Sequence, residues 1–172
     1  MLPKIREILY ATDLTKNSAY AFRYAVIAAQ NFASQIHILH VLEKVPSSVE
    51  GFLKGNLDAL QLSKSWEERR GEQIKRIHQR LGEFVKRELN NDPSQMKGVA
   101  SILVVEGDPA IEILQKADEL NCDLVIMGTH GHGVVGHTFL GSVAERVLHR
   151  ITKPVFIVPI PKADIDISFR DI

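Results

Sequence analysis

Short apolar runs rich in β-branched residues alternate along this chain with longer amphipathic stretches. The apolar runs have the length and composition of strands, and they cover residues 5–11, 35–41, 99–105, 124–127 and 155–158. The amphipathic stretches predict helices over about residues 18–32, 57–90, 109–120 and 142–150. Such alternation is typical of an α/β domain built on one mainly parallel sheet.

Glycine and proline mark possible interruptions in the middle of the chain. Residues 57–90 form one long helix or two, because Gly71 and Gly82 could break the helical run. Residues 46–56 contain a proline and two glycines and predict a loop. This loop and the start of the following helix could cover one end of the sheet.

Capping residues predict where two of the later helices begin. Asp108 followed by Pro109 supplies an N-cap and a first helical residue. The sequence Ser142-Val143-Ala144-Glu145 has the pattern of a capping box. In that motif the serine hydroxyl binds the amide three residues on, and the glutamate returns to the serine amide.

Composition restricts the classes of protein to which the chain can belong. Its 172 residues are 45% apolar, which allows one domain with an ordinary core. The 21 basic and 21 acidic residues cancel, so no global charge favours nucleic acid or an anionic membrane. The single cysteine, Cys122, precedes an apolar run and is interpreted as a small core residue. No apolar run approaches the length of a membrane span or signal sequence, so we expect a cytoplasmic protein.

A glycine-rich segment between residues 127 and 142 is the strongest indication of function. Gly128 and Gly131 follow an apolar run, and Gly141 precedes the helix expected at Ser142. Glycines let successive backbone N–H groups turn toward one point and form a cavity for an anion. Ligands of open α/β sheets bind beyond the carboxyl ends of the strands, where Asp13 also falls. A carboxylate and a phosphate cradle would then face one crevice, as a nucleotide requires.

Each of these features also has a structural explanation. Glycine-rich turns between a strand and a helix can serve packing alone. Asp13 can cap a helix, since Thr15 and Ser18 mark a helix start beside it. The two roles of Asp13 are compatible.

Three histidines in the same segment, His130, His132 and His137, raise the question of a metal site. The segment lacks the cysteine or carboxylate that would complete a closed site, so we expect these histidines to face solvent or phosphate. The charged stretch 64–87 mixes signs as a solvated helix face does. Trp66 at its start could pack inward or mark a partner surface.

The sequence resembles the universal stress protein family, in its ATP-binding branch. Gly128, Gly131 and Gly141-Ser142 match the family motif Gly-x2-Gly-x9-Gly-Ser/Thr. The runs Ile8-Leu9-Tyr10-Ala11-Thr12-Asp13 and Lys153-Pro154-Val155-Phe156-Ile157-Val158-Pro159 are also similar to family signatures. The likeness covers about residues 3–160. We therefore expect one universal stress protein domain over residues 1–160 and a C-terminal tail over 161–172.

The resemblance implies a fold and a site. The fold is a Rossmann-like, adenine nucleotide alpha-hydrolase-like sheet of five parallel strands in the order 3-2-1-4-5, with helices on both faces. The implied ligand is ATP or another adenine nucleotide, with Mg²⁺ or Mn²⁺ bound through the phosphates. The implied nucleotide-binding residues are Ala11, Asp13, Val41, Met127, Gly128, Gly131, Gly141, Ser142 and Val143. Close relatives often have proline where this chain has Ala11.

The sequence favours binding over catalysis. The glycine segment lacks the lysine of a standard P-loop, and no paired carboxylates lie near it. We expect a nucleotide-dependent regulator or switch in the stress response, with an unidentified regulatory protein as its partner. A slow or partner-dependent ATPase is the first alternative, with His130 or His132 as its only candidate base. A pure interaction module with a structural glycine segment is the second.

The last strand predicts self-association. Residues 155–158 are short, apolar and last in the chain, so we expect them at a sheet edge with unpaired backbone groups. The family resemblance implies a homodimer through this strand, from Val155 to Val158. We expect no nucleic-acid partner and no membrane partner.

Overall fold

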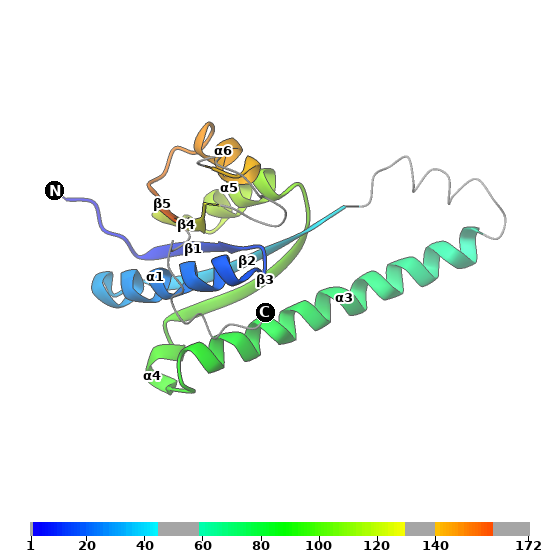
Figure 1. Cartoon of the computed structure of the whole chain (residues 1–172), viewed down its shortest axis with the longest axis horizontal. Helices are drawn as coiled ribbons and strands as arrows, with labels where there is room; N and C mark the ends of the chain where they lie inside the picture. Colours follow the sequence, from blue (N-terminus) through cyan, green and yellow to red (C-terminus); the bar gives the residue numbers. More distant parts are fainter. Residues whose placement is uncertain (1, 45–58, 130–139, 160–172) are drawn as a thin grey trace.

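The computed structural model describes residues 2–44, 59–129 and 140–159, with the backbone alone for residues 16–17 and 59–65. Within these residues the chain forms one parallel sheet of five strands, shown in Figure 1. The strands are β1 (Glu7–Thr12), β2 (Gln35–Glu43), β3 (Val99–Gly107), β4 (Leu124–Gly128) and β5 (Val155–Val158). Their order is β3-β2-β1-β4-β5, which confirms the predicted fold class and strand order.

Helices cover both faces of the sheet. Two long helices, α1 (Lys16–Phe32) and α3 (Ala59–Glu88), pack on one face, and α5 (Pro109–Glu119) and α6 (Ser142–Leu148) pack on the other. Alternate residues of each strand enter the two cores, since successive side chains point to opposite faces. In β1, for example, Ile8 and Tyr10 join the α1–α3 core and Leu9 joins the α5–α6 core.

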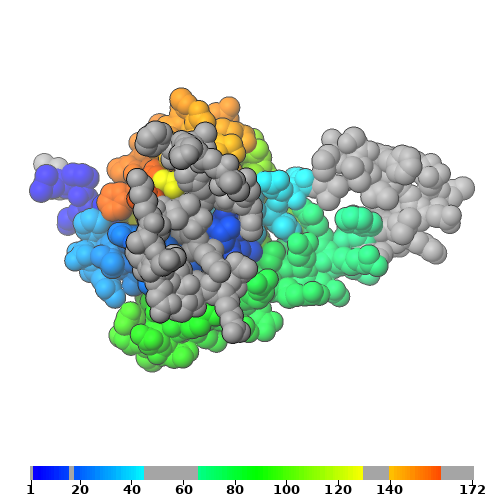
Figure 2. Space-filling model, viewed as in Figure 1, coloured from blue at the N-terminus to red at the C-terminus, as the bar shows by residue number. Residues whose placement is uncertain are grey.

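The long central helix is continuous. Gly71 and Gly82 do not interrupt α3, although both sequence alternatives were open. A Cβ at either glycine would meet nothing within 4 Å, so no close packing requires glycine there. Figure 1 shows that the N-terminal part of this helix extends to one side of the sheet, and in Figure 2 the described residues of this part project from one side of the molecule. Trp66 there is 44% exposed. Within the described residues no helix is long and apolar enough to cross a membrane.

The predicted capping box at Ser142 is wrong. Gly141 is the N-cap of α6, in extended conformation with φ −74° and ψ 157°, and no side chain caps the helix. The Gly141 carbonyl accepts the first helical bond from the Glu145 amide at 3.0 Å. A capping serine must itself hold this extended position, whereas Ser142 is already the first helical residue.

Two other helix starts depend on local side chains. Helix α1 begins at Lys16, earlier than predicted, because the Thr15 side chain caps it by accepting from the Ser18 amide. A short helix missed by the sequence analysis, α4 (Pro93–Met96), begins at Asp92, whose carboxylate accepts from the Ser94 amide. The predicted N-cap at Asp108 is confirmed.

The remaining expectations have different outcomes. Cys122 is 2% exposed in the α5–α6 core, and burial raises the pKa of its thiol to about 11. The strand β5 lies at an edge of the sheet, as predicted. The expected loop over residues 46–56 and the tail over 161–172 lie outside the described residues.

Candidate functional site

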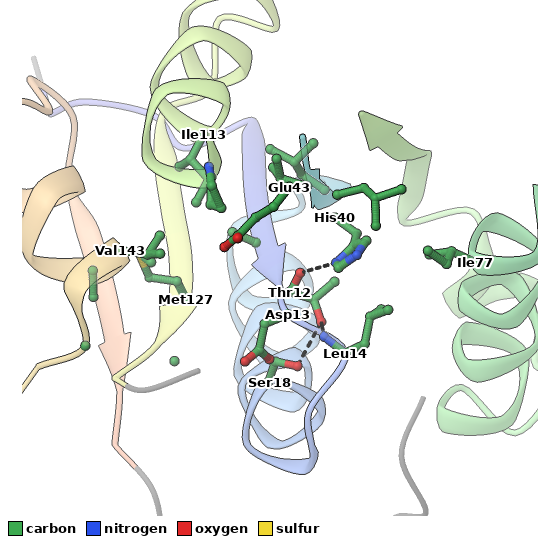
Figure 3. Close-up of a pocket in the computed structure, with 18 of the residues that line it drawn as sticks. Thr12, Asp13, Leu14, Ser18, His40, Glu43, Ile77, Ile113, Met127 and Val143 are labelled. Carbon is green, nitrogen blue, oxygen red and sulfur yellow. Dashed lines mark hydrogen bonds between the residues drawn. The ribbon is translucent and has the colours of Figure 1, made fainter. Parts of the chain in front are cut away.

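A cavity of about 660 Å³ opens at the carboxyl edge of the sheet. The ends of β1, β2 and β4 form its floor, and residues of α3, α5 and α6 form its walls (Figure 3). The chain leaves β1 toward β2 on one side, while β4 pairs with β1 on the other. The cavity therefore lies where the strand order reverses, the usual ligand position in open α/β sheets.

Eight of the nine residues predicted for the site line this one cavity. They are Ala11, Asp13, Val41, Met127, Gly128, Gly141, Ser142 and Val143. The ninth, Gly131, lies outside the described residues, as do His130, His132 and His137. The expectation that Asp13 and the glycines at both ends of the glycine-rich segment face one crevice is thus met by the described part of the chain.

Asp13 is the most unusual side chain in the cavity. Its Oδ1 accepts hydrogen bonds from the Thr15 amide at 3.0 Å and from the Thr15 hydroxyl at 2.6 Å. Its Oδ2 is buried and has no hydrogen-bond partner among the described residues. A buried acceptor without a partner costs about 1–3 kcal/mol, so such groups are rare unless a ligand or water satisfies them.

The capping alternative for Asp13 is resolved by these contacts. Thr15, not Asp13, caps α1. Asp13 fixes the position of Thr15, because its Oδ1 accepts from the Thr15 amide and hydroxyl. Between them Leu14 adopts a left-handed conformation with φ 68°. Only one carboxylate oxygen is needed for the turn, which leaves the other for the cavity.

A buried network fixes the turn that presents Asp13. The Thr12 hydroxyl lies 2.8 Å from the Ser18 hydroxyl and accepts from the Leu14 amide at 3.1 Å. The Tyr10 hydroxyl donates to the Ser18 carbonyl, and burial raises the Tyr10 pKa far above its usual value, which keeps it a donor. The His40 Nδ1 donates to the Thr12 carbonyl at 2.9 Å. These bonds hold the turn in one geometry before any ligand arrives.

The opposite wall is tied together at the ends of the glycine-rich segment. The Gly141 amide donates to the Thr129 carbonyl at 2.7 Å, and the Thr129 amide donates to Val158 at 3.0 Å. Arg146 of α6 makes two 2.9 Å hydrogen bonds to Asp108 at the start of α5. This guanidinium lowers the pKa of Asp108. The positions of Gly128 and Gly141 are therefore fixed by the sheet and by α5.

Among the cavity residues that the sequence analysis missed are three polar residues of α3. Gln73, Arg76 and Arg80 of α3 line the cavity, although the charged stretch that holds them was interpreted as a solvated face. The spacing of these residues around Ile77, which is 8% exposed, places them on one side of the helix. That spacing becomes a signal only once the packing of Ile77 in the α1–α3 core is known. Among the described residues no group of three or more His, Cys, Asp or Glu side chains is placed to hold a metal ion.

Comparison with known proteins identifies one family over most of the chain. The model of the universal stress protein family matches residues 4–159. Universal stress protein MJ0577 of Methanocaldococcus jannaschii is 28% identical over 156 residues, which are 89% of this chain and 94% of that protein.

Solved structures share the fold. The structure of MJ0577 superposes with a TM-score of 0.64 at 25% identity, covering 94% of this chain and all of the other. A universal stress protein in complex with cAMP has a TM-score of 0.53 at 19% identity, with 91% and 98% covered. With the family match spanning nearly its whole length, this chain belongs to the universal stress protein family.

Proposed function

We propose that this chain binds an adenine nucleotide, with ATP the expected form, and acts as a nucleotide-dependent regulator in the stress response. The observation that carries the proposal is the buried Oδ2 of Asp13, which has no partner among the described residues and belongs to a residue that lines the cavity. A ribose hydroxyl is a donor of the right kind for this oxygen. The Gly-x2-Gly-x9-Gly-Ser pattern supplies phosphate contacts on the opposite wall.

The walls suit the parts of such a nucleotide. Ala11 and Val41, together with Ile113 and Met127, give an apolar slot for a base near the ends of β1 and β2. The backbone near Val41, two residues before the end of β2, would meet the base edge. Slots of this kind, with a few placed polar groups, are typical of cofactor sites.

The phosphate end would use backbone groups and one hydroxyl. Gly128, Gly141, Ser142 and Val143 border this end of the cavity, and Gly131 completes the motif in the sequence. Mg²⁺ or Mn²⁺ would bind mainly through phosphate oxygens and water, with the Ser142 hydroxyl as a candidate protein ligand. A site with few protein ligands suits Mg²⁺, which keeps several of its waters.

Support from relatives is of two kinds. The motif is the one that the ATP-binding branch of the family carries, and a neighbour of the same fold was solved with cAMP, itself an adenine nucleotide. The Asp13 turn is held rigidly by protein contacts, which suits binding. We therefore propose nucleotide-dependent regulation as the main function and hydrolysis as the alternative.

Calorimetric titration of nucleotide-stripped protein with ATP and Mg²⁺ tests this proposal. We expect saturable binding near one equivalent per chain, and competition with a fluorescent adenine nucleotide. Absence of both heat and competition would leave the glycine-rich segment a structural element and favour an interaction module.

We also propose that two copies pair through β5. Within the described residues this strand has β4 on one side only, and Phe156 on it is 45% exposed. A Phe156→Lys substitution should shift the protein from dimer to monomer in sedimentation velocity, because a buried lysine would oppose pairing. A native protein that is monomeric at micromolar concentration would contradict the dimer.

A further inference from the structure

The cavity extends to α3, beyond the residues assigned above to the nucleotide. Figure 3 shows residues that line the cavity on both sides of β1. Ile113, Met127 and Val143 lie on one side, and His40 and Ile77 lie on the other. The first side is the slot assigned to base and 5′-phosphates. The second side faces α3.

The α3 side carries positive charge. Gln73, Arg76 and Arg80 all line the cavity, at positions i, i+3 and i+7 of one helix face. Ile77 anchors this face, because it is 8% exposed and belongs to the α1–α3 core. Residues three or four apart lie together on a helix surface, so the anchor directs its neighbours to the cavity.

Two acidic residues at the ends of β2 and β3, Glu43 and Glu106, have other partners or point elsewhere. Glu106 forms an ion pair with Arg70 at 2.9 Å, and Arg70 also donates to the Glu43 carbonyl. The Glu43 side chain borders the cavity, but in Figure 3 its carboxylate points away from α3. Arg76 takes part in none of the ion pairs found among the described residues.

We propose that the α3 side is a second phosphate subsite, which takes a phosphate on the 2′ or 3′ oxygen of the nucleotide's ribose. The inference rests on the proposed function, in which the ribose lies at Asp13. One ribose hydroxyl donates to Asp13 Oδ2, and the other can carry a phosphate toward Arg76 and Arg80. Arginine binds phosphate through two parallel hydrogen bonds, and arginines accommodate ribose phosphates in dinucleotide sites in the same way. The preferred ligand class is thus a nucleoside phosphorylated on the 5′ oxygen and on the 2′ or 3′ oxygen of its ribose.

A matched set of ligands tests the subsite. Calorimetry would compare adenosine 5′-monophosphate with adenosine 2′,5′-bisphosphate and adenosine 3′,5′-bisphosphate, which differ by one phosphate. We expect one bisphosphate to bind about tenfold more tightly than the monophosphate, as a charge-assisted pair at a partly exposed site provides. The ratio should shrink as salt is added, because exposed charges are screened.

Substitutions on α3 locate the effect. Arg76→Met and Arg80→Met should each reduce the ratio toward one, whereas Lys75→Met, an exposed neighbour that does not line the cavity, should keep it. Circular dichroism spectra would verify that α3 remains folded in each variant. Equal binding of mono- and bisphosphates, or a gain that survives both arginine substitutions, would overturn the subsite. Failure of all adenine nucleotides to bind would instead overturn the proposed function.

Discussion

Polar residues at the amino ends of the strands, the amino edge, have a different role from those at the carboxyl ends, the carboxyl edge. At the amino edge Asp123 accepts from the Arg6 amide at 2.7 Å and from the Glu7 amide at 3.1 Å through one oxygen. At the carboxyl edge Asp13 engages Thr15 with one oxygen and leaves the other buried without a partner among the described residues. Asp123 stabilises the fold, whereas Asp13 leaves one oxygen as an acceptor for a ligand.

Three side chains hydrogen-bonded in series at the amino edge also hold the strands together. Glu7 of β1, His37 of β2 and Ser101 of β3 are linked by contacts of 2.9 Å and 2.7 Å. A carboxylate only accepts, so His37 Nε2 donates to Glu7, and His37 Nδ1 shares a hydrogen bond with the Ser101 hydroxyl. The order resembles a nucleophile–base–acid set, but none of the three residues lines the cavity at the carboxyl edge. The polar groups of these three residues hydrogen-bond to one another and have a structural role.

The comparison teaches where stability and function reside in this fold. Paired polar groups stabilise the native state, whereas an unpaired buried acceptor reduces stability and is retained where a ligand completes it. Variants at the amino edge should therefore change stability and leave nucleotide binding intact. Variants at the carboxyl edge should do the reverse.

The substitution Gly141→Asp is expected to reduce nucleotide affinity the most while leaving stability without ligand equal or higher. A carboxylate there would occupy the position of a phosphate, and like charges in contact cost several kcal/mol, so nucleotide affinity should fall about 100-fold. The extended backbone of Gly141, with φ −74° and ψ 157°, accepts any residue, and aspartate is a favoured N-cap. Thermal unfolding without ligand should show equal or higher stability. Gly141→Ala is the matched control, and unchanged affinity in the aspartate variant would contradict the phosphate assignment.

The second test is Asp13→Asn. The asparagine oxygen can still accept from Thr15, while an NH₂ group replaces the unpartnered oxygen. We expect affinity for adenine nucleotides to fall about tenfold, because the ribose hydroxyl loses a charged acceptor. Stability without ligand should stay within about 0.5 kcal/mol of the native protein. Asp118→Asn on the exposed surface of α5 controls for the loss of one charge; a large loss of stability with full affinity would reverse the roles assigned to the two edges.

Asp123→Asn should affect stability and its pH dependence. Backbone hydrogen bonds from Arg6 and Glu7 lower the pKa of Asp123 in the folded protein. The stabilising contribution is therefore present above the unfolded-state pKa of about 4 and is lost as pH falls through the lower folded value. We expect the variant to be less stable by about 1–2 kcal/mol at pH 7, with the difference shrinking in acid. Urea unfolding at pH 7 and pH 3 measures both; a difference that grows in acid would contradict this origin.

Much of this contrast could be predicted from the sequence, because it follows from position along the chain. Asp13 and Gly128 each follow an apolar run, so parallel topology places both at the carboxyl edge. The identity of the α6 cap could not be predicted, since Gly141 and Ser142 are both acceptable N-caps and a one-residue shift decides between them.

The role of Arg76 and Arg80 was not predicted for a different reason. The helix α3 carries charges around most of its surface, and periodicity alone does not show which side meets a cavity. Only the packing of Ile77 on the sheet fixes that rotation. Glycines 71 and 82 were misleading as possible breaks, because a helix anchored by tertiary contacts tolerates the roughly 1 kcal/mol that each glycine costs.

The smallest expected effect is that of Ser101→Ala at the amino edge. The substitution removes the hydroxyl that hydrogen-bonds with His37 Nδ1, while Glu7 continues to hold Nε2. The His37 side chain is 13% exposed, so water can replace only part of the lost bond, and we expect a loss of about 1 kcal/mol in unfolding free energy. Nucleotide affinity should not change, because the chain of three residues lies at the opposite edge from the cavity. A drop in affinity without loss of stability would show that the amino edge communicates with the ligand, and the separation of the two edges would then fail.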